Sequence, residues 1–448
     1  MDQRTLLDIV TTQSKVLTSS AQVQLVILQG GVAVVQEENQ RLHDEAEAGR
    51  QRGGSRPGRS ANIQRNFEAG YQRLYKDYFA KNPLYNDYQC RRRFRMHRSL
   101  FLKIVNDVTE YDQYFVRKAD AAGKLGLYSL QKITSALRIL ADGEAADRND
   151  EYLRIGESTS HKSLERFCKA IIAIYGDEYL REPNEADTKR LLLINKKGGF
   201  PGMLGSLDCM HWEWKNCPTA WAGQYQGKEK VPTLVLEAVV SQDLWFWHAF
   251  FGLPGAHNDR NVLDLSPLFQ SLLAGKTPPC QYTVNGTSYN HGYYLADGIY
   301  PDWTTLIKTI SQPQGLQQKY FAKMQEAARK DVERGFGVLQ ARFAIVARPG
   351  LSWSHCKMQK VMRTCIILHN MIVEDERDVT HDSFYHQQSN SEATRPASTR
   401  SADLSLFIKN YREMRDSQRH FTLRDDLIAH LWARKGKMTE DSSDSYSD

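Results

Sequence analysis

The chain contains 448 residues, of which 41% are hydrophobic and 25% are charged, and its formal net charge is +6. This length predicts two or three domains, because single cores stop growing beyond roughly 250–300 residues. The composition is typical of a soluble globular protein. No apolar run approaches the roughly 18 residues that a membrane-spanning helix needs, so we expect no membrane partner. Seven scattered cysteines without a CxxC pair favour reduced thiols over a zinc site.

Positive charge is concentrated near the N-terminal third of the chain. Residues 50–98 contain 13 Lys and Arg against 3 Asp and Glu, a net charge of +10, so the remainder carries −4. The densest part surrounds Phe94 and His97 with five arginines: Arg91, Arg92, Arg93, Arg95 and Arg98. Such a block predicts contact with nucleic acid or a nuclear import signal, and a solvated linker is the alternative.

The first half of the chain is predicted to be mainly helical. Residues 1–60 lack a sustained heptad and end in linker composition, so we expect disorder or weak helix there. Residues 61–185 have helical character. Aromatic residues four positions apart place Phe67, Tyr71, Tyr75 and Phe79 on one helix face, where packing is favoured over stacking on bases.

Three short helices are predicted within residues 128–175. The first is Ser129–Leu140, ended by Gly143, the second covers about 145–155, and the third opens after residues 158–160. This outline is typical of a helix-turn-helix unit, although many helical bundles share it. The exposed leading turns of the unit supply candidate DNA-binding residues, namely Ser160, His161, Lys162 and Arg166.

The second half of the chain alternates β-branched and aromatic runs with helical stretches. This pattern predicts an α/β domain over residues 195–380. Residues 381–400 are polar and are predicted to form a linker. Residues 401–436 regain helical periodicity, and residues 437–448 form an acidic tail that we expect to be disordered.

Two aspartates follow apolar runs in the α/β domain. Asp208 ends the run that begins at Met203, and Asp297 ends the run that begins at Tyr293 and precedes a Gly and a Pro. An unpaired carboxylate on a buried strand is costly, and a metal ion would offset that cost. Because sites of open α/β sheets lie at strand ends, both aspartates are expected to face one crevice.

A third carboxylate lies in a predicted long helix over about 316–340. Glu333 borders an apolar stripe, and the candidate phosphate-binding residues flank it: Arg329, Lys330 and Arg334. Carboxylates suit Mg²⁺ or Mn²⁺, and two such ions can drive phosphoryl transfer. The alternative is that each acid caps a turn or pairs with a nearby base.

The sequence around these acids resembles the PIF/Harbinger transposases, over roughly residues 90–436. The matching stretches are GSLDCMHWEWKNCP (205–218), LPGAHNDRNVLDLSPLF (253–269), YTVNGTSYNHGYYLADGIYP (282–301), QEAARKDVERGFGVLQARFAIV (325–346) and CIILHNMIVEDER (365–377). The resemblance implies an RNase H-like domain, a mixed sheet flanked by helices, preceded by a helical helix-turn-helix-like region. It also implies an Asp-Asp-Glu triad of Asp208, Asp297 and Glu333, with 35 residues between the last two.

The resemblance implies a DDE transposase that cleaves DNA at transposon terminal repeats and joins 3′ ends to a target site with Mg²⁺ or Mn²⁺. It further implies a Myb/SANT-like partner protein, and we expect a homo-oligomer located in the nucleus, with some in the cytoplasm. A domesticated DNA- or chromatin-binding adaptor that no longer cuts, or a general metal nuclease, are the alternatives. His257 matches a family motif and either orients water, contacts DNA or packs in a loop.

Overall fold

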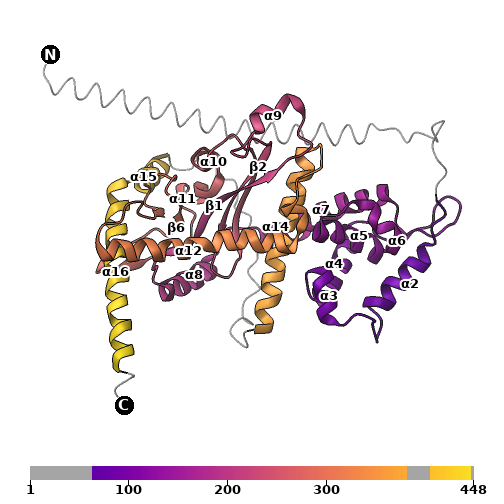
Figure 1. Cartoon of the computed structure of the whole chain (residues 1–448), viewed down its shortest axis with the longest axis horizontal. Coiled ribbons are helices and arrows are strands. Elements are labelled where there is room, and N and C mark those ends of the chain that lie inside the picture. The colour runs from indigo at the N-terminus through magenta and orange to yellow at the C-terminus, as the bar shows by residue number, and fades with distance from the viewer. Residues whose placement is uncertain (1–62, 381–403, 445–448) are drawn as a thin grey trace. The chain divides into compact units, whose positions relative to one another are not determined.

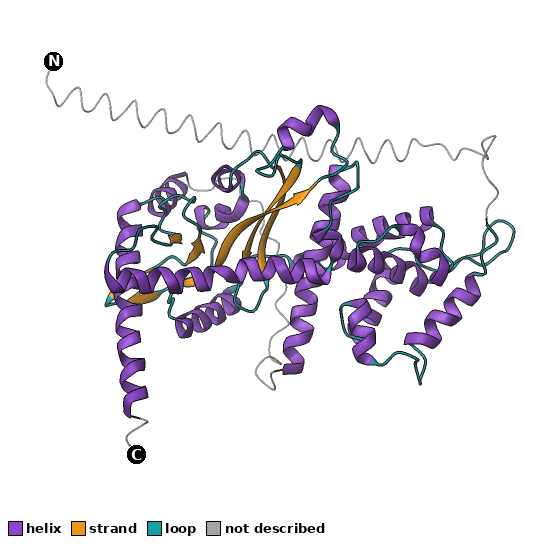
Figure 2. Ribbon diagram, in the orientation of Figure 1, coloured by secondary structure: helices purple, strands orange, loops and turns teal. Residues whose placement is uncertain are grey.

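The computed structural model describes residues 63–380 and 404–444. The predictions for residues 1–60 and for the linker 381–400 therefore lie outside the described residues. Helices predominate, and the strands are confined to residues 203–308 among those described (Figure 2). The helices before the first strand are α2 (Phe67–Tyr78), α3 (Asp87–Phe94), α4 (Arg98–Tyr111), α5 (Ser129–Asp142), the 3₁₀ turn η1 (Ala146–Arg148), α6 (Asn149–Leu153), α7 (Glu157–Tyr179) and α8 (Glu185–Gly198).

The helix boundaries follow local capping chemistry. The Asn66 side chain accepts a hydrogen bond from the Ala69 N–H at 3.0 Å and begins α2. Gly143 ends α5, as predicted, with a left-handed φ of 61°. A Cβ at this position would lie 2.9 Å from the Ala344 carbonyl carbon, so glycine also lets α5 approach α13 (Ala344–Ala347) closely.

The predicted start of the third helix was wrong. Helix α7 begins at Glu157 after an N-cap at Gly156, so Ser158 and Ser160 lie within its first turn. The Ser160 side chain is buried, and its Oγ lies 3.0 Å from the Ser135 Oγ on α5. The three-helix outline over residues 129–179 is present, while its assignment as a helix-turn-helix unit stays a prediction.

A five-stranded mixed sheet forms the centre of the second half, in the order β3-β2-β1-β6-β7. Strands β1, β2 and β3 pair antiparallel, and β1, β6 and β7 pair parallel. A separate hairpin of β4 and β5 turns at Asn285 and Gly286, whose φ values are 49° and 85°. The strands are β1 (Met203–Glu213), β2 (Thr233–Val240), β3 (Phe246–Pro254), β4 (Tyr282–Val284), β5 (Thr287–Tyr289), β6 (Tyr293–Ala296) and β7 (Leu306–Lys308).

Helices flank this sheet, as the sequence predicts. Helix α12 runs along it (Figure 1) and contacts β1, β2 and β6, while α8 contacts β1 and α14 contacts β3. The helices that follow β1 are α9 (Thr219–Tyr225), α10 (Asp259–Leu265), the 3₁₀ turn η2 (Pro267–Phe269), α11 (Gln270–Leu273), α12 (Gly315–Arg342), α13, α14 (His355–Thr380), α15 (Leu404–Met414) and α16 (Ser417–Asp444). The predicted helix over 316–340 matches α12 closely.

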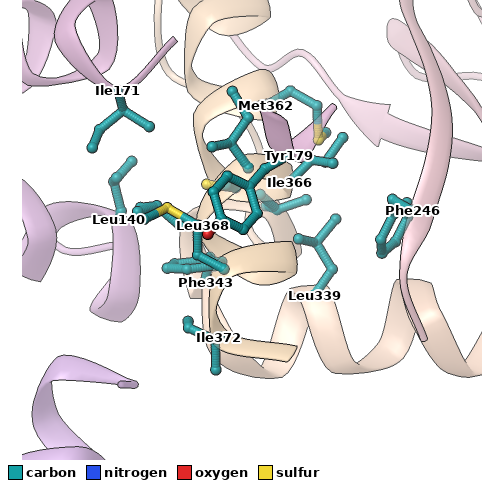
Figure 3. Packing of buried hydrophobic residues seen from close by; sticks show 14 of the residues in the cluster. Leu140, Ile171, Tyr179, Phe246, Leu339, Phe343, Met362, Ile366, Leu368 and Ile372 are labelled. Atoms are coloured by element: carbon teal, nitrogen blue, oxygen red, sulfur yellow. The ribbon is translucent and has the colours of Figure 1, made fainter. Parts of the chain in front are cut away.

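One hydrophobic core joins the helical first half to the sheet. Leu140 of α5 and Ile171 of α7 belong to the same cluster as Phe246 of β3, Leu339 of α12 and Ile366 of α14 (Figure 3). All five side chains are almost completely buried. Because burial of apolar area is the dominant stabilising contribution to folding, this cluster fixes α12 relative to both the sheet and α14.

A second cluster attaches the C-terminal helix to the sheet. Leu423, Leu427, Ile428 and Leu431 of α16 are buried, in agreement with the predicted periodicity, and they pack with Ile307 of β7. The helix continues to Asp444, whereas the sequence predicts disorder from residue 437, so that expectation was wrong for residues 437–444. Residues 445–448 lie outside the described residues.

The seven cysteines carry no disulfide, and four of them are buried. Burial raises the pKa of the Cys168 thiol to about 12, so it is a protonated packing group at neutral pH. Within the described residues, no helix combines the length and the apolar character needed to cross a bilayer.

Replacing Leu339 with alanine should lower the free energy of unfolding by about 3 kcal/mol, because it removes a fully buried side chain and leaves a cavity. The matched control is Leu316→Ala on the same helix, where the side chain is 73% exposed, and it should change stability by less than about 0.5 kcal/mol. Urea unfolding monitored by circular dichroism measures both. Equal shifts for the two variants would contradict the assignment of the core.

Candidate active site

Strand β1 presents alternate side chains to helix α12. The Ser206 hydroxyl donates to the Ala328 carbonyl at 3.1 Å, and Gln340 Nε2 donates to Met210 Sδ at 3.4 Å. Because side chains of a strand alternate between its two faces, Asp208 shares the face of Ser206 and Met210. Asp208 therefore points toward α12.

Asp208 lies in the middle of β1, so the expectation that it ends a strand was wrong. The pairing of β1 with β6 ends just before Asp208, because the last pair joins Ser206 to Leu295. Strand β6 stops at Ala296, and Asp297 comes next. Asp208 and Asp297 each lie two residues beyond the last parallel pair, Asp208 within β1 and Asp297 directly after β6. The register of β1 and β6 therefore places the two aspartates at the same edge, although only Asp297 follows the end of a strand.

Helix α12 is held against this edge by buried polar contacts. The fully buried Gln325 donates from Nε2 to the carbonyls of Ala296 and Ile307, both at 3.1 Å. Further along, Gly335 allows a close approach to the sheet, since a Cβ there would lie 2.9 Å from Val240 Cγ1. Glu333 lies between these two anchors, and its side chain is 46% exposed, at the border of the buried stripe.

Arg329 connects two of the three predicted acids. Its Nη1 donates to Asp208 Oδ2 at 2.8 Å, and its Nη2 lies 2.9 Å from Glu333 Oε1. The other two cations that the sequence singles out behave differently. Lys330 is exposed, and Arg334 pairs with Asp331 at 2.6 Å.

The position of Asp208 changes its proton affinity. Burial raises the pKa of this carboxyl to about 6, against the lowering effects of the Cys209 N–H, which donates to it at 2.9 Å, and of the Arg329 charge. The negative charges of Asp259 and Asp297 add to the rise of the Asp208 pKa. Negative charge is therefore crowded at this sheet edge, and a cation would be stabilised there.

Asp259 is a site residue that the sequence reasoning did not select. It opens α10 after the N-cap Asn258, and burial together with the charges of Asp297 and Glu237 raises its pKa. Glu237 on β2 is fully buried and receives hydrogen bonds from His248 and Ser266. The motif at 253–269 contains both residues, and only His257 was predicted to have a role.

The three predicted acids lie at one edge of the sheet, but their carboxylates are not close enough together to bind one metal ion. Within the described parts of the chain, no group of three or more His, Cys, Asp and Glu side chains is arranged to hold a metal ion. The donor chemistry suits Mg²⁺ or Mn²⁺, since the acids offer carboxylate oxygens. The cation that joins Asp208 and Glu333 in this arrangement is the Arg329 guanidinium.

The candidate DNA-binding residues of α7 are placed differently from one another. Ser160 is buried against α5, so its predicted exposure was wrong: the first turn packs inward at this position. His161 and Lys162 are exposed. Arg166 pairs with Asp112 at 2.9 Å and lies over the Tyr114 ring, which leaves its side chain 39% exposed.

Comparison with known proteins identifies the class of this domain. Residues 177–380, which contain the sheet and all three acids, match the family described as plant transposon protein. Residues 70–109 match a domain of unknown function, DUF8418. No solved structure gives a significant match.

The chain is also similar to curated proteins. It is 25% identical over 265 residues to "Protein ALP1-like" of Arabidopsis thaliana, covering 57% of this chain and 64% of that protein. It is 21% identical over 252 residues to "Putative nuclease HARBI1" of Homo sapiens and of Bos taurus, covering 55% of this chain and 68% of those proteins. The aligned part is thus less than two thirds of the Arabidopsis protein. Over the domain that carries the sheet, the chain is similar to Harbinger-type transposase-derived proteins.

Replacing Asp208 with asparagine should have a pH-dependent effect on stability in the presence of EDTA. Because the folded-state pKa of Asp208 is raised to about 6, its contribution to stability is present at low pH and is lost as the pH rises through that value. The free energy of unfolding of Asp208→Asn minus that of the wild type should therefore be about 1 kcal/mol larger at pH 8 than at pH 5, because only the wild type loses stability over this range. Thermal or chemical unfolding at the two pH values measures this difference.

Asp243→Asn serves as the control for this experiment. Burial alone would raise the pKa of Asp243, but Arg377 and Arg190 outweigh burial and lower it, so this carboxyl stays ionised at both pH values. Its replacement should cost the same stability at pH 5 and pH 8. An identical pH response of the two variants would contradict the environment described for Asp208.

Proposed function

We propose that the chain is a metal-dependent DNA nuclease and strand transferase of the DDE transposase type. It would cleave phosphodiester bonds at transposon ends and join the freed 3′ ends to target DNA. The observation that carries this proposal is the convergence of Asp208, Asp297 and Glu333 on one sheet edge of a plant transposon protein domain. The nuclease named among the relatives supports the same class of activity.

The sheet topology supports an RNase H-like catalytic domain. Three antiparallel strands followed by two parallel ones, in the order β3-β2-β1-β6-β7, are compatible with that fold. The acids would then come from the middle strand, the end of its parallel neighbour and a later helix. The 35 residues between Asp297 and Glu333 span β7 and most of α12.

The three acids would differ in how rigidly they hold a metal ion, because their surroundings differ. Asp208, Asp297 and Glu333 would hold divalent cations, which when bound supply an activated water or 3′-hydroxyl and stabilise the leaving oxygen. Asp297 and Glu333 are exposed, so they can adjust to a bound backbone, whereas Asp208 is fixed by the sheet. Exposed Lys330 and the partly exposed Arg334 lie beside Glu333 and would contact phosphates.

The partners and location follow from this function. We propose double-stranded DNA as substrate, a Myb/SANT-like partner protein, a homo-oligomer and a nuclear location. Three arginines of the block at 91–98 are held by the fold, because Arg91 pairs with Glu376, Arg93 with Tyr78 and Arg95 with Asp142. Arg92 is exposed, and the arginines at 50–59 lie outside the described residues.

Nicking of a supercoiled plasmid in Mg²⁺ or Mn²⁺ tests the proposal. Asp208→Asn and Glu333→Gln should each slow nicking at least about 100-fold, because loss of a direct ligand costs more than loss of its supporting contacts. Glu185→Gln is the control, since Glu185 is exposed on α8 and pairs with Lys189 of the same helix. It should nick at the wild-type rate.

Two results would overturn the proposal in different ways. Nicking by Asp208→Asn at the wild-type rate would place the chemistry elsewhere. A wild-type protein that binds plasmid DNA but does not nick it in either metal would favour the adaptor that no longer cuts. Joining of a labelled 3′-hydroxyl oligonucleotide to the plasmid separates a strand transferase from a simple nuclease.

A further inference from the structure

The Arg329 side chain is a cation built into the centre of the candidate site. It bridges a strand and a helix, since its two terminal nitrogens bind Asp208 Oδ2 at 2.8 Å and Glu333 Oε1 at 2.9 Å. Only 16% of the Arg329 side chain and 17% of the Asp208 side chain are exposed, so the contact between these two is largely shielded from solvent. Shielded pairs are weakened less by salt than exposed ones.

The position of Arg329 is fixed by a hydrogen bond between strand β1 and helix α12. The neighbouring Ala328 carbonyl accepts the Ser206 hydroxyl, two residues before Asp208 on β1. This bond brings the turn of α12 that carries Arg329 directly over the Asp208 face of the strand. Glu333 follows four residues later, which puts it on the same side of the helix as Arg329.

The charge of Arg329 is needed where it lies. Asp208 is mostly buried, and its charge is repelled by Asp259 and Asp297. The two carboxylates that Arg329 holds, Asp208 and Glu333, are two of the three that would hold a divalent cation at this edge.

We propose that Arg329 is a competitor of divalent cations, which holds Asp208 and Glu333 until a metal ion displaces its guanidinium. The proposal rests on the metal site of the proposed function and adds its regulation. A guanidinium and a divalent ion repel each other, and they compete for the lone pairs of the same carboxylates. Arg329 thus sets how tightly the site binds metal, and once displaced it is free to face a DNA phosphate.

Mn²⁺ titration of the full chain, followed by the electron paramagnetic resonance signal of free Mn²⁺, tests this proposal. Arg329→Ala should bind Mn²⁺ at least about tenfold more tightly than the wild type, because tenfold corresponds to about one charge-assisted contact and Arg329 makes two. Lys323→Ala is the control on the same helix and should leave the affinity unchanged, because Lys323 is exposed and precedes Arg329 by six residues. Unchanged or weaker binding by Arg329→Ala would overturn the proposal.

Two further variants separate the possible failures. Asp208→Asn should abolish binding in both the wild-type and Arg329→Ala backgrounds, and if it does not, the proposed metal site itself is wrong. If Asp208→Asn abolishes binding but Arg329→Ala binds like the wild type, only the competition is wrong. Should Arg329→Ala fail to fold, Arg329→Lys decides, since lysine cannot bridge two acids as a planar fork: tighter binding supports competition, and equal or weaker binding excludes it.

Discussion

The parallel pairing of β1 with β6 is short, and the candidate site depends on where it ends. After the pair of Ser206 with Leu295, β1 continues alone on that side while β6 stops. The backbone beyond the last pair no longer needs to match a neighbour, so two aspartates can occupy adjacent positions there. A longer β6 would have filled this edge with ladder hydrogen bonds and carried Asp297 into the sheet.

Helix α12 completes the arrangement because it is fastened at both strands. Gln325 binds the carbonyl of the residue before Asp297, and Ala328 accepts a bond from the strand that carries Asp208. These contacts are polar and well buried, so they fix orientation as well as position. The apolar stripe supplies most of the binding of the helix to the body, and the polar contacts determine which turn faces the acids.

The acids themselves oppose this packing. The carboxylates of Asp208, Asp259 and Asp297 repel one another, and burial of Asp208 adds a desolvation cost. Arg329 offsets part of that cost from within the chain. A site of this kind trades stability for the capacity to bind a cation, which is the usual situation of clustered charges at functional sites.

Much of this could be predicted from the sequence. Periodicity located α12 and its stripe, and a glycine marked the end of α5, because both signals are local. The resemblance selected the three acids, whereas the residues alone left capping and ion pairing open.

Three features were not predictable from local pattern. Asp208 lies inside β1, since strand ends depend on the partner strand. Ser160 is buried, since a helix start does not show which face packs. Arg329 turns inward, since a cation beside an apolar stripe can lie on either border.

Cleavage of the backbone by bound Fe²⁺ tests the central claim most directly. With ascorbate and peroxide, Fe²⁺ held by the full chain generates radicals that cut the polypeptide next to its ligands. A common metal site predicts fragments that end near Asp208, Asp297 and Glu333 together, all suppressed by excess Mg²⁺. Cuts that cluster elsewhere, or at only one of these three segments, would contradict a common site on β1, β6 and α12.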